Sequence, residues 1–334
     1  MTSSGGSVQH REVLASPAEE LPAVRRPRPG PIAVLPEPTE FFVSAIQEAG
    51  GIVEPLSAAT RGIVWLSYAR ANEFSGILDE YPDVDWVQLP WAGVDAFAGV
   101  LAKHSGTHPL WTSAKGAYAE PVAEHALALM LALLRQLPMR IVARSWGPKL
   151  GASLYGARVV VVGAGGIAVE LLRLLEPFRT SVTIVRRHPE PVPGAERTVT
   201  ADRLHEVLPD ADVVVVAAAM TKDSTHLMGE AEFAAMKDSA ILVNVARGGL
   251  VDTAALTAAL ASGGIAGAGL DVTDPEPLPD GHPLWSEPRA IITPHSADTP
   301  EMTTPLLAER VKTNVRAFLD HAKFVGIVDP EAGY

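Results

Sequence analysis

Apolar and polar positions alternate in blocks along the first third of the chain. Its short apolar runs are PIAVLP from Pro31, GIVEP from Gly51, GIVWLS from Gly62 and VDWVQLP from Val84. The segments between these runs have helical or turn character, and such alternation is typical of β and α units around a parallel sheet. We therefore predict a first α/β domain in this part of the chain.

A second series of strand candidates begins at Val159. It comprises VVVV from Val159, SVTIVRR from Ser181, ADVVVVAAA from Ala211, AILVNV from Ala240, GAGLDV from Gly267 and AIITP from Ala290. Four consecutive valines indicate a strand that is buried on both faces of a sheet. Residues 300–318 then have the apolar spacing of a helix. This series predicts a second α/β domain with a parallel sheet.

A long apolar segment, EPVAEHALALMLALLRQLP from Glu120, lies between the two series. It is apolar on nearly every side of a helix as far as Arg135, so we expect a helix that is buried all round. An interface between domains or between subunits would bury such a helix.

Length and charge narrow the class of protein. The chain has 334 residues, which exceeds an ordinary domain of roughly 100–200 residues and favours two domains that share a cleft. A formal net charge of −12 argues against nucleic acid or an anionic membrane as partner, because both need a basic face. The absence of cysteine excludes disulfides and thiolate chemistry and is typical of a cytoplasmic protein.

The N-terminal 30 residues differ from the rest of the chain. They lack the apolar core of a signal peptide, and we predict a mobile tail over residues 1–30. No later stretch has the length and apolar character of a membrane span. Paired histidines and clustered carboxylates with metal-ligand spacing are absent from the sequence, so we expect no metal.

A glycine motif follows the valine strand. Gly163, Gly165 and Ala168 form a G-x-G-x-x-A pattern between this strand and a helical stretch. The first glycine allows a tight turn, the second lets the backbone approach a pyrophosphate, and the alanine permits close packing of helix on strand. The N–H groups at the helix start, which include those of Gly166 and Ile167, would bind the phosphates. The pattern predicts a Rossmann dinucleotide-binding domain.

Two arginines stand about 20 residues beyond the glycines, where a domain that binds NAD usually has an acidic residue. Arg186 and Arg187 follow the second strand candidate of the series. Their guanidinium groups suit the 2′-phosphate of NADP, so we predict NADP(H), with NAD(H) as the alternative. Solvated surface arginines at a strand end are the competing interpretation.

Three further strings carry more specific information. They are NVARGGLVD from Asn244, GLDVTDPEPLP from Gly269 and ITPHSA from Ile292. Their order and spacing resemble the D-isomer-specific 2-hydroxy acid dehydrogenase family, and the resemblance extends from about Pro31 to Phe318. It implies a Rossmann domain over residues 119–298, inserted into a flavodoxin-like substrate domain that comprises residues 31–118 and 299–334. Both domains would be doubly wound parallel sheets, and the segments near Tyr118 and Asp298 would serve as hinges.

The resemblance implies a catalytic set of Arg247, Glu276 and His295. Reduction of a 2-oxo acid needs a proton donor that titrates near neutrality, which histidine provides. A carboxylate on the far ring nitrogen fixes the tautomer and favours the imidazolium, which is the role of Glu276. The planar guanidinium of Arg247 would hold the substrate carboxylate and polarise its carbonyl group. Each residue taken singly is more often structural or solvated, and only their common position after strands favours function.

The first domain is expected to contribute the string LPWAGVDAF from Leu89. In the family the corresponding loop binds the substrate carboxylate through backbone N–H groups, which here belong to Ala92 and Gly93. Trp91 would narrow the pocket or cover the nicotinamide, and packing alone explains it equally well. Asp271 matches a family position near the nicotinamide amide, although an aspartate after a strand also caps turns.

The resemblance favours an NADPH-dependent reductase for glyoxylate or hydroxypyruvate that forms a homodimer. Oxidation of 3-phosphoglycerate is the alternative within the family. A dinucleotide-sensing scaffold of the corepressor kind is the alternative from another functional class, and the intact catalytic set argues against it.

Overall fold

The computed structural model describes residues 9–15, 18–106, 108–320 and 323–333. The chain divides into two compact units, one of residues 1–118 and 300–334 and one of residues 119–299. Within the described residues, no helix combines the length and apolar character that a bilayer crossing needs.

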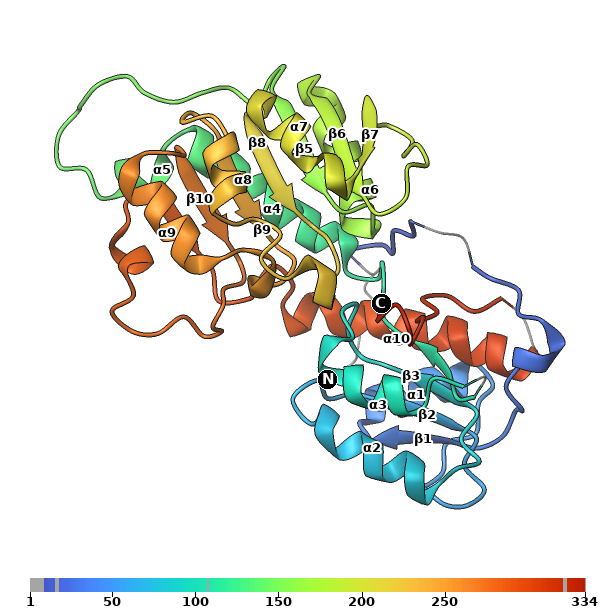
Figure 1. Cartoon of the computed structure of the whole chain (residues 1–334). Coiled ribbons are helices and arrows are strands. Elements are labelled where there is room, and N and C mark those ends of the chain that lie inside the picture. The colour runs from blue at the N-terminus through green and yellow to red at the C-terminus, as the bar shows by residue number, and fades with distance from the viewer. Residues whose placement is uncertain (1–8, 16–17, 107, 321–322, 334) are drawn as a thin grey trace. The chain divides into compact units, whose positions relative to one another are not determined.

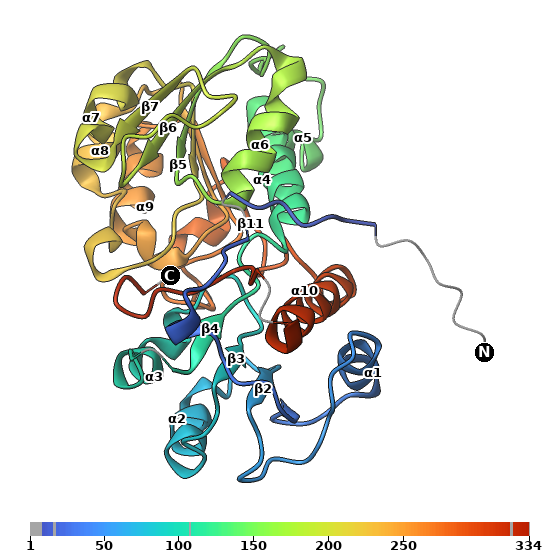
Figure 2. The same ribbon diagram turned by 90° about the vertical axis from the view of Figure 1, so that its right-hand side faces the viewer.

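The first unit is built around a parallel sheet with the strand order β1-β2-β3-β4. Its elements are β1 (Ile32–Leu35), α1 (Glu40–Glu48), β2 (Gly62–Trp65), α2 (Ala71–Glu80), β3 (Trp86–Gln88), α3 (Ala98–Lys103), β4 (Leu110–Thr112) and α10 (Pro300–Asp320). Helices α1 and α10 cover one face of this sheet, and α2 and α3 cover the other (Figure 2). An apolar core under α2 and α3 includes the buried Trp65, Phe74 and Trp111.

The segment GIVEP, which the sequence predicts as a strand, makes only a single parallel bridge between Val53 and Ile32. Glu54 and Pro55 follow directly, and a proline has no N–H with which to continue a ladder. The bridge nevertheless places this segment on the outer side of β1. The resulting order is that of a flavodoxin-like sheet.

The second unit has a parallel sheet with the order β11-β10-β9-β8-β5-β6-β7. Its elements are α4 (Ala119–Leu134), α5 (Leu137–Ile141), β5 (Arg158–Val162), α6 (Gly166–Leu175), β6 (Ser181–Arg186), β7 (Arg197–Thr200), α7 (Leu204–Val207), β8 (Val213–Val216), α8 (Glu230–Ala235), β9 (Ile241–Asn244), α9 (Thr253–Ser262), β10 (Gly267–Leu270) and β11 (Ala290–Ile292). Figures 1 and 2 show α4 and α6 on one face and α7, α8 and α9 on the other. The order reverses between β5 and β8, as in Rossmann sheets. The prediction of two doubly wound α/β domains is confirmed.

The helix predicted from Glu120 forms as α4. Helix α4 packs on α6 and on strands β9 and β10 of its own unit. Its opposite side exposes Glu124 and Ala128 in the single chain. Burial of this side at an interface between domains or subunits stays a prediction.

The prediction of a mobile N-terminal tail does not hold for its described residues. Leu21 is buried, and Glu19 pairs with Phe324 in an antiparallel bridge. The Arg28 guanidinium forms an ion pair with the nearly buried Asp85 carboxylate at a distance of 2.5 Å. A polar, proline-containing segment can thus be ordered by partners that lie far away in the sequence. Residues 1–8 and 16–17 lie outside the described residues.

Candidate functional site

Three adjacent strands of the second unit end at the same edge of its sheet. Their last residues, Asn244 of β9, Leu270 of β10 and Ile292 of β11, are register partners. Arg247, Glu276 and His295 all follow these strand ends in the sequence. Carboxyl ends of parallel strands are where open α/β sheets bind ligands. The fold therefore gathers the loops that carry the three sequence-predicted catalytic residues.

His295 and Glu276 are brought into direct contact. The His295 Nδ1 atom lies 2.7 Å from the Glu276 Oε1 atom, which is a hydrogen-bond distance. Because the carboxylate accepts, Nδ1 carries the hydrogen, and Nε2 is left as the nitrogen that exchanges a proton. The histidine side chain is 24% exposed, so a reactant can reach it.

The loop of His295 is organised by Asp271, the residue directly after β10. Its Oδ1 atom accepts from Thr293 Oγ1 at 2.6 Å and from the Ser296 N–H at 2.9 Å, and its Oδ2 atom accepts from the Ala297 N–H at 3.1 Å. His295 itself has a left-handed φ of 50°, which costs energy for a residue other than glycine. The buried Asp271 carboxylate accepts these hydrogen bonds and thereby stabilises the conformation of the His295 loop.

His125 of α4 contacts the same loop. Its Nε2 atom lies 3.0 Å from Thr293 Oγ1 and 3.5 Å from Asp271 Oδ1. These contacts give His125 a structural role in this loop. A ring with satisfied hydrogen bonds inside a helix is more often architectural than catalytic.

Arg247 is held in a tight turn after β9. The fully buried Asn244 donates from Nδ2 to the Arg247 carbonyl at 2.9 Å and accepts the Ala246 N–H at 3.1 Å. At Gly248 a Cβ atom would lie 1.8 Å from the Thr273 carbonyl oxygen, so only glycine fits there. This close approach joins the arginine turn to the segment that leads to Glu276.

Asp298 is an acidic neighbour of this site that the sequence did not single out for catalysis. Burial raises the pKa of Asp298 to about 6, and the Asp271 carboxylate adds to that rise. The charges of His295 and Arg247 oppose this rise. A raised pKa means that Asp298 is neutral below about pH 6 and becomes negative above it. The sequence could have indicated Asp298 as a site residue, because it lies only three positions after His295.

The glycine motif lies at the opposite part of the same sheet edge, where the strand order reverses. Gly163 has a φ of 118°, and a Cβ atom there would lie 2.4 Å from the Ala217 carbonyl oxygen. Gly165 caps α6 without a side-chain hydrogen bond, and a Cβ atom at Gly165 would meet nothing within 4 Å. The first-turn N–H groups of α6, at Gly166 and Ile167, directly follow this turn. Such a helix start fits a pyrophosphate.

The basic pair lies beside the glycine turn. Gly163 donates its N–H to the carbonyl of Val185 at 2.8 Å, and Arg186 is the next residue and the last of β6. Arg187 follows and is exposed. The Arg186 guanidinium donates to the Glu190 carbonyl, in the loop that follows β6, at 3.4 Å. The pair is placed where the ribose end of a bound dinucleotide would be expected.

In the first unit, the predicted substrate loop follows β3. Ala92 is exposed and Gly93 is partly exposed. The ring of Trp91 packs against the ring of Tyr68, with 5.2 Å between centroids. The Tyr68 hydroxyl donates to Asp95 at 2.5 Å. The sequence interpretation did not include Tyr68, although it follows β2 at the same edge of the sheet as the loop follows β3.

Metal chemistry gains no support from the side chains. The described part of the chain contains no group of three or more histidine and acidic residues that could hold an ion. The arrangement instead offers candidates for a proton donor, a substrate-binding guanidinium and an anion-binding helix start. Together these groups suit hydride chemistry on an acidic substrate.

The chain is similar to known proteins over most of its length. Residues 127–297 match the family described as D-isomer specific 2-hydroxyacid dehydrogenase, NAD binding domain. An uncharacterised protein encoded in the proB 3′ region of Corynebacterium melassecola is 38% identical over 273 residues, which cover 78% of this chain and 88% of the relative. A mouse glyoxylate reductase/hydroxypyruvate reductase is 34% identical over 236 residues, covering 68% and 71% respectively.

Solved structures agree with these relatives. A D-isomer specific 2-hydroxyacid dehydrogenase from Xanthobacter autotrophicus Py2, solved with NADPH and MES, is 26% identical and has a TM-score of 0.78. The match covers 92% of this chain and 100% of that structure. The chain is therefore a member of the D-isomer-specific 2-hydroxyacid dehydrogenase family, and its second unit contains the NAD-binding domain.

Proposed function

We propose that the protein reduces a small 2-oxo acid, of the glyoxylate or hydroxypyruvate type, to the D-2-hydroxy acid. The observation that carries this proposal is the 2.7 Å contact between His295 Nδ1 and Glu276 Oε1. The pair supplies a proton donor with a fixed tautomer at the carboxyl edge of the sheet. The names of the mouse relative and of other relatives support glyoxylate and hydroxypyruvate as substrates.

A dinucleotide held at the glycine turn by the N–H groups of Gly166 and Ile167 would supply the hydride that the carbonyl carbon receives. His295 Nε2 donates a proton to the carbonyl oxygen, and the Glu276 carboxylate stabilises the imidazolium before the transfer. The Arg247 guanidinium binds the substrate carboxylate and stabilises the negative charge that develops on the carbonyl oxygen. The N–H groups of Ala92 and Gly93 are proposed as further donors to a substrate carboxylate. In the reverse direction the neutral His295 accepts the proton.

A panel of 2-oxo acids tests this function. Purified protein with NADPH should lose absorbance at the nicotinamide wavelength with glyoxylate or hydroxypyruvate, and the product should have the D configuration where it is chiral. Tight NADPH binding without turnover of any acid would overturn the proposal and favour a dinucleotide-sensing scaffold. Turnover confined to oxidation of 3-phosphoglycerate would assign the enzyme to the other branch.

We further propose NADPH as the preferred cofactor, because Arg186 and Arg187 flank the position expected for a 2′-phosphate. The NADPH in the structure from Xanthobacter autotrophicus Py2 supports this choice. Asp271 is proposed to accept a hydrogen bond from the nicotinamide amide in addition to those from the His295 loop. A carboxylate has enough lone pairs to accept from several donors.

Replacement of Arg186 by aspartate should lower the ratio of kcat/KM for NADPH to that for NADH by about 100-fold, since a charge-assisted contact to phosphate is lost and a repulsive charge is added. Steady-state kinetics with both cofactors measures the ratio. Arg158→Asp is the matched control, because Arg158 begins β5 at the opposite edge of the sheet. A ratio in Arg186→Asp equal to that in the control would assign Arg186 to the solvated surface.

We propose that the protein is a homodimer that forms through the second unit. Exposed apolar side chains follow α4 in the chain: Leu137, Ile141, Val142, Trp146 and Leu150. Trp146 is 89% exposed, which is costly for an indole in water. Light scattering should give about twice the chain mass of 35.3 kDa, and Trp146→Ser should shift the population toward the monomer. A wild-type monomer at micromolar concentration would contradict the proposal.

A further inference from the structure

The substrate loop of residues 89–93 is held through three successive carbonyl groups. The Leu89 carbonyl accepts from Gln88 Nε2 at 2.8 Å, and the Pro90 carbonyl accepts from the Tyr118 hydroxyl at 2.7 Å. The Trp91 carbonyl accepts from the Ala114 N–H at 3.1 Å. These carbonyls therefore face the interior of the first unit.

This arrangement fixes the direction of the N–H groups that follow. In a planar trans peptide, the N–H of one residue points away from the carbonyl of the residue before it. Because Ala114 holds the Trp91 carbonyl, the Ala92 N–H is directed away from Ala114. The anchoring of the loop thus sets the orientation of a donor that the proposed function assigns to the substrate carboxylate.

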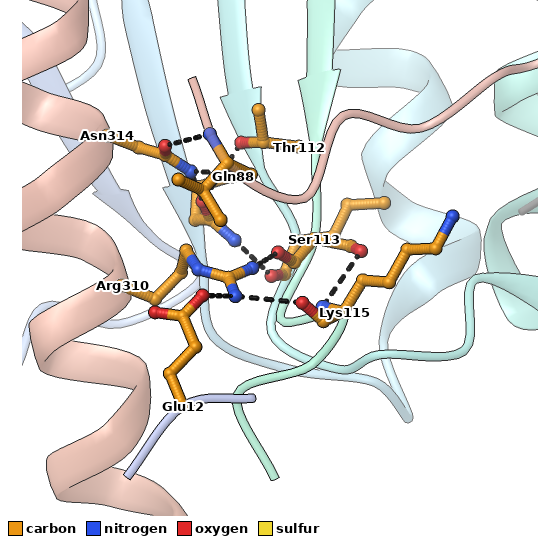
Figure 3. A network of polar contacts seen from close by, with 9 residues as sticks. Glu12, Gln88, Thr112, Ser113, Lys115, Arg310 and Asn314 are labelled. Atoms are coloured by element: carbon orange, nitrogen blue, oxygen red, sulfur yellow. Dashed lines mark hydrogen bonds and ion pairs between the residues drawn. The ribbon is translucent and has the colours of Figure 1, made fainter. Parts of the chain in front are cut away.

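The segment of residues 113–118, which anchors the loop, is itself held by a buried guanidinium (Figure 3). Arg310 of α10 donates to the carbonyls of Ser113 and Lys115, the latter at 2.8 Å, and these two residues flank Ala114. Arg310 is 0% exposed. Its fork of donors therefore fixes the backbone on both sides of the N–H that binds Trp91.

The charge of Arg310 is balanced from the N-terminal segment. The Glu12 carboxylate forms an ion pair with the Arg310 guanidinium, and the Figure 3 view shows Glu12 beside it. The next residue, Val13, donates its N–H to the Gly116 carbonyl at 3.0 Å. Burial lowers the pKa of Arg310, and the Glu12 carboxylate opposes that change. A buried charge that loses its partner is strongly destabilised.

We propose that Glu12, Arg310 and Tyr118 are positioning residues for the substrate-carboxylate loop. The N-terminal segment neutralises Arg310, Arg310 fixes residues 113–118, and these residues orient the peptide groups of residues 90–92. The inference rests on the proposed function, since it assigns the loop to substrate binding. Part of the segment predicted as a mobile tail thereby contributes to the substrate site.

Glu12→Gln and Tyr118→Phe test this proposal, because the first removes a charge and the second removes only a hydroxyl group. We expect the KM for the 2-oxo acid to rise about 10-fold in each, which corresponds to the loss of one well-oriented contact to a carboxylate. The Kd for NADPH, measured by fluorescence titration without substrate, should change less than about 2-fold, because the cofactor motif belongs to the other unit. Glu12→Asp should restore most of the affinity.

Arg28→Gln is the matched control. It breaks the ion pairs of the N-terminal segment with Asp83 and with Asp85, the residue before β3, and leaves the ion pair of Glu12 with Arg310 in place. Assays are run well below the melting temperature of every variant, so a purely structural role would leave the KM at the wild-type value in all of them. A wild-type KM in both Glu12→Gln and Tyr118→Phe would overturn the proposal.

Hydrogen exchange of the unliganded protein separates this inference from the proposed function. The Ala114 amide should exchange about 10-fold faster in Glu12→Gln than in Arg28→Gln, because its hydrogen bond to Trp91 is weakened. Unchanged exchange over residues 113–117 would overturn the inference even if the enzyme is active. Absence of turnover in the wild type, together with the expected exchange, would instead refute the proposed function alone.

Discussion

Replacement of His295 by alanine should lower kcat for reduction of the 2-oxo acid by about 1,000-fold, since it removes the proton donor. The Kd for NADPH should stay within about 2-fold of the wild-type value, because His295 is assigned to proton transfer and not to cofactor binding. Pre-steady-state and steady-state NADPH consumption measure the rate, and fluorescence titration measures the affinity.

A second histidine and glutamate pair in the same unit provides the control. His205 Nε2 lies 2.7 Å from Glu232 Oε1, but His205 is 52% exposed and belongs to α7. His205→Ala should therefore retain wild-type kcat. Glu276→Gln should lower kcat less than His295→Ala does, since the imidazole remains but its tautomer is no longer fixed. Wild-type kcat in His295→Ala would remove this residue from the mechanism.

Replacement of Arg247 by alanine should lower kcat/KM for the 2-oxo acid by about 1,000-fold or more. Two contributions are lost together: the contact to the substrate carboxylate and the stabilisation of the developing oxyanion, each of which is worth about 2–4 kcal/mol in enzymes. Arg247→Lys keeps the charge and loses the planar fork, so it should recover only part of the activity. Steady-state kinetics over a range of substrate concentrations separates the effects on kcat and KM.

Arg289→Ala is the control for a nonspecific loss of positive charge in the second unit. Arg289 pairs with Glu287 at 2.7 Å and lies before β11, at the end of the sheet away from Arg247. Its replacement should leave kcat/KM near the wild-type value. Equal losses in both variants would indicate that Arg247 acts through overall charge or stability and not through contact with the substrate.

The elements with strong patterns were predictable from the sequence. The valine runs became β5 and β8, and the glycine motif lies between β5 and α6 as expected. Two short strands escaped prediction. Strand β4 is only Leu110–Thr112, and β7 has the sequence RTVT, whose polar residues give no apolar run. Such strands form because hydrogen bonds to neighbouring strands and side-chain packing stabilise them, although their own sequences show no strand pattern.

The candidate site was predictable as a set of residues but not as an arrangement. The motifs identified His295, Glu276 and Arg247, and the structure shows that the first two are in hydrogen-bond contact. The Asp271 carboxylate accepts hydrogen bonds from the N–H groups of Ser296 and Ala297. The spacing of residues in the sequence does not predict these contacts.

The ion pair that holds the segment next to the proposed substrate loop was the least predictable feature. Glu12 and Arg310 form an ion pair although 298 positions separate them in the sequence. A lone glutamate in a polar segment and a lone arginine in a helix both have the pattern of solvated surface residues. Only the fold shows that the arginine is fully buried and that the glutamate neutralises it.

Transfer of deuterium from NADPH to the product tests the proposed reduction of a 2-oxo acid. The protein is incubated with glyoxylate or hydroxypyruvate and with NADPH that carries deuterium on the transferable face of nicotinamide C4, and the product is examined by NMR and chiral chromatography. Direct hydride transfer should place one deuterium on C2 of the product and, from hydroxypyruvate, give the D configuration at that carbon. Product without deuterium on C2, or glycerate of the L configuration, would contradict it.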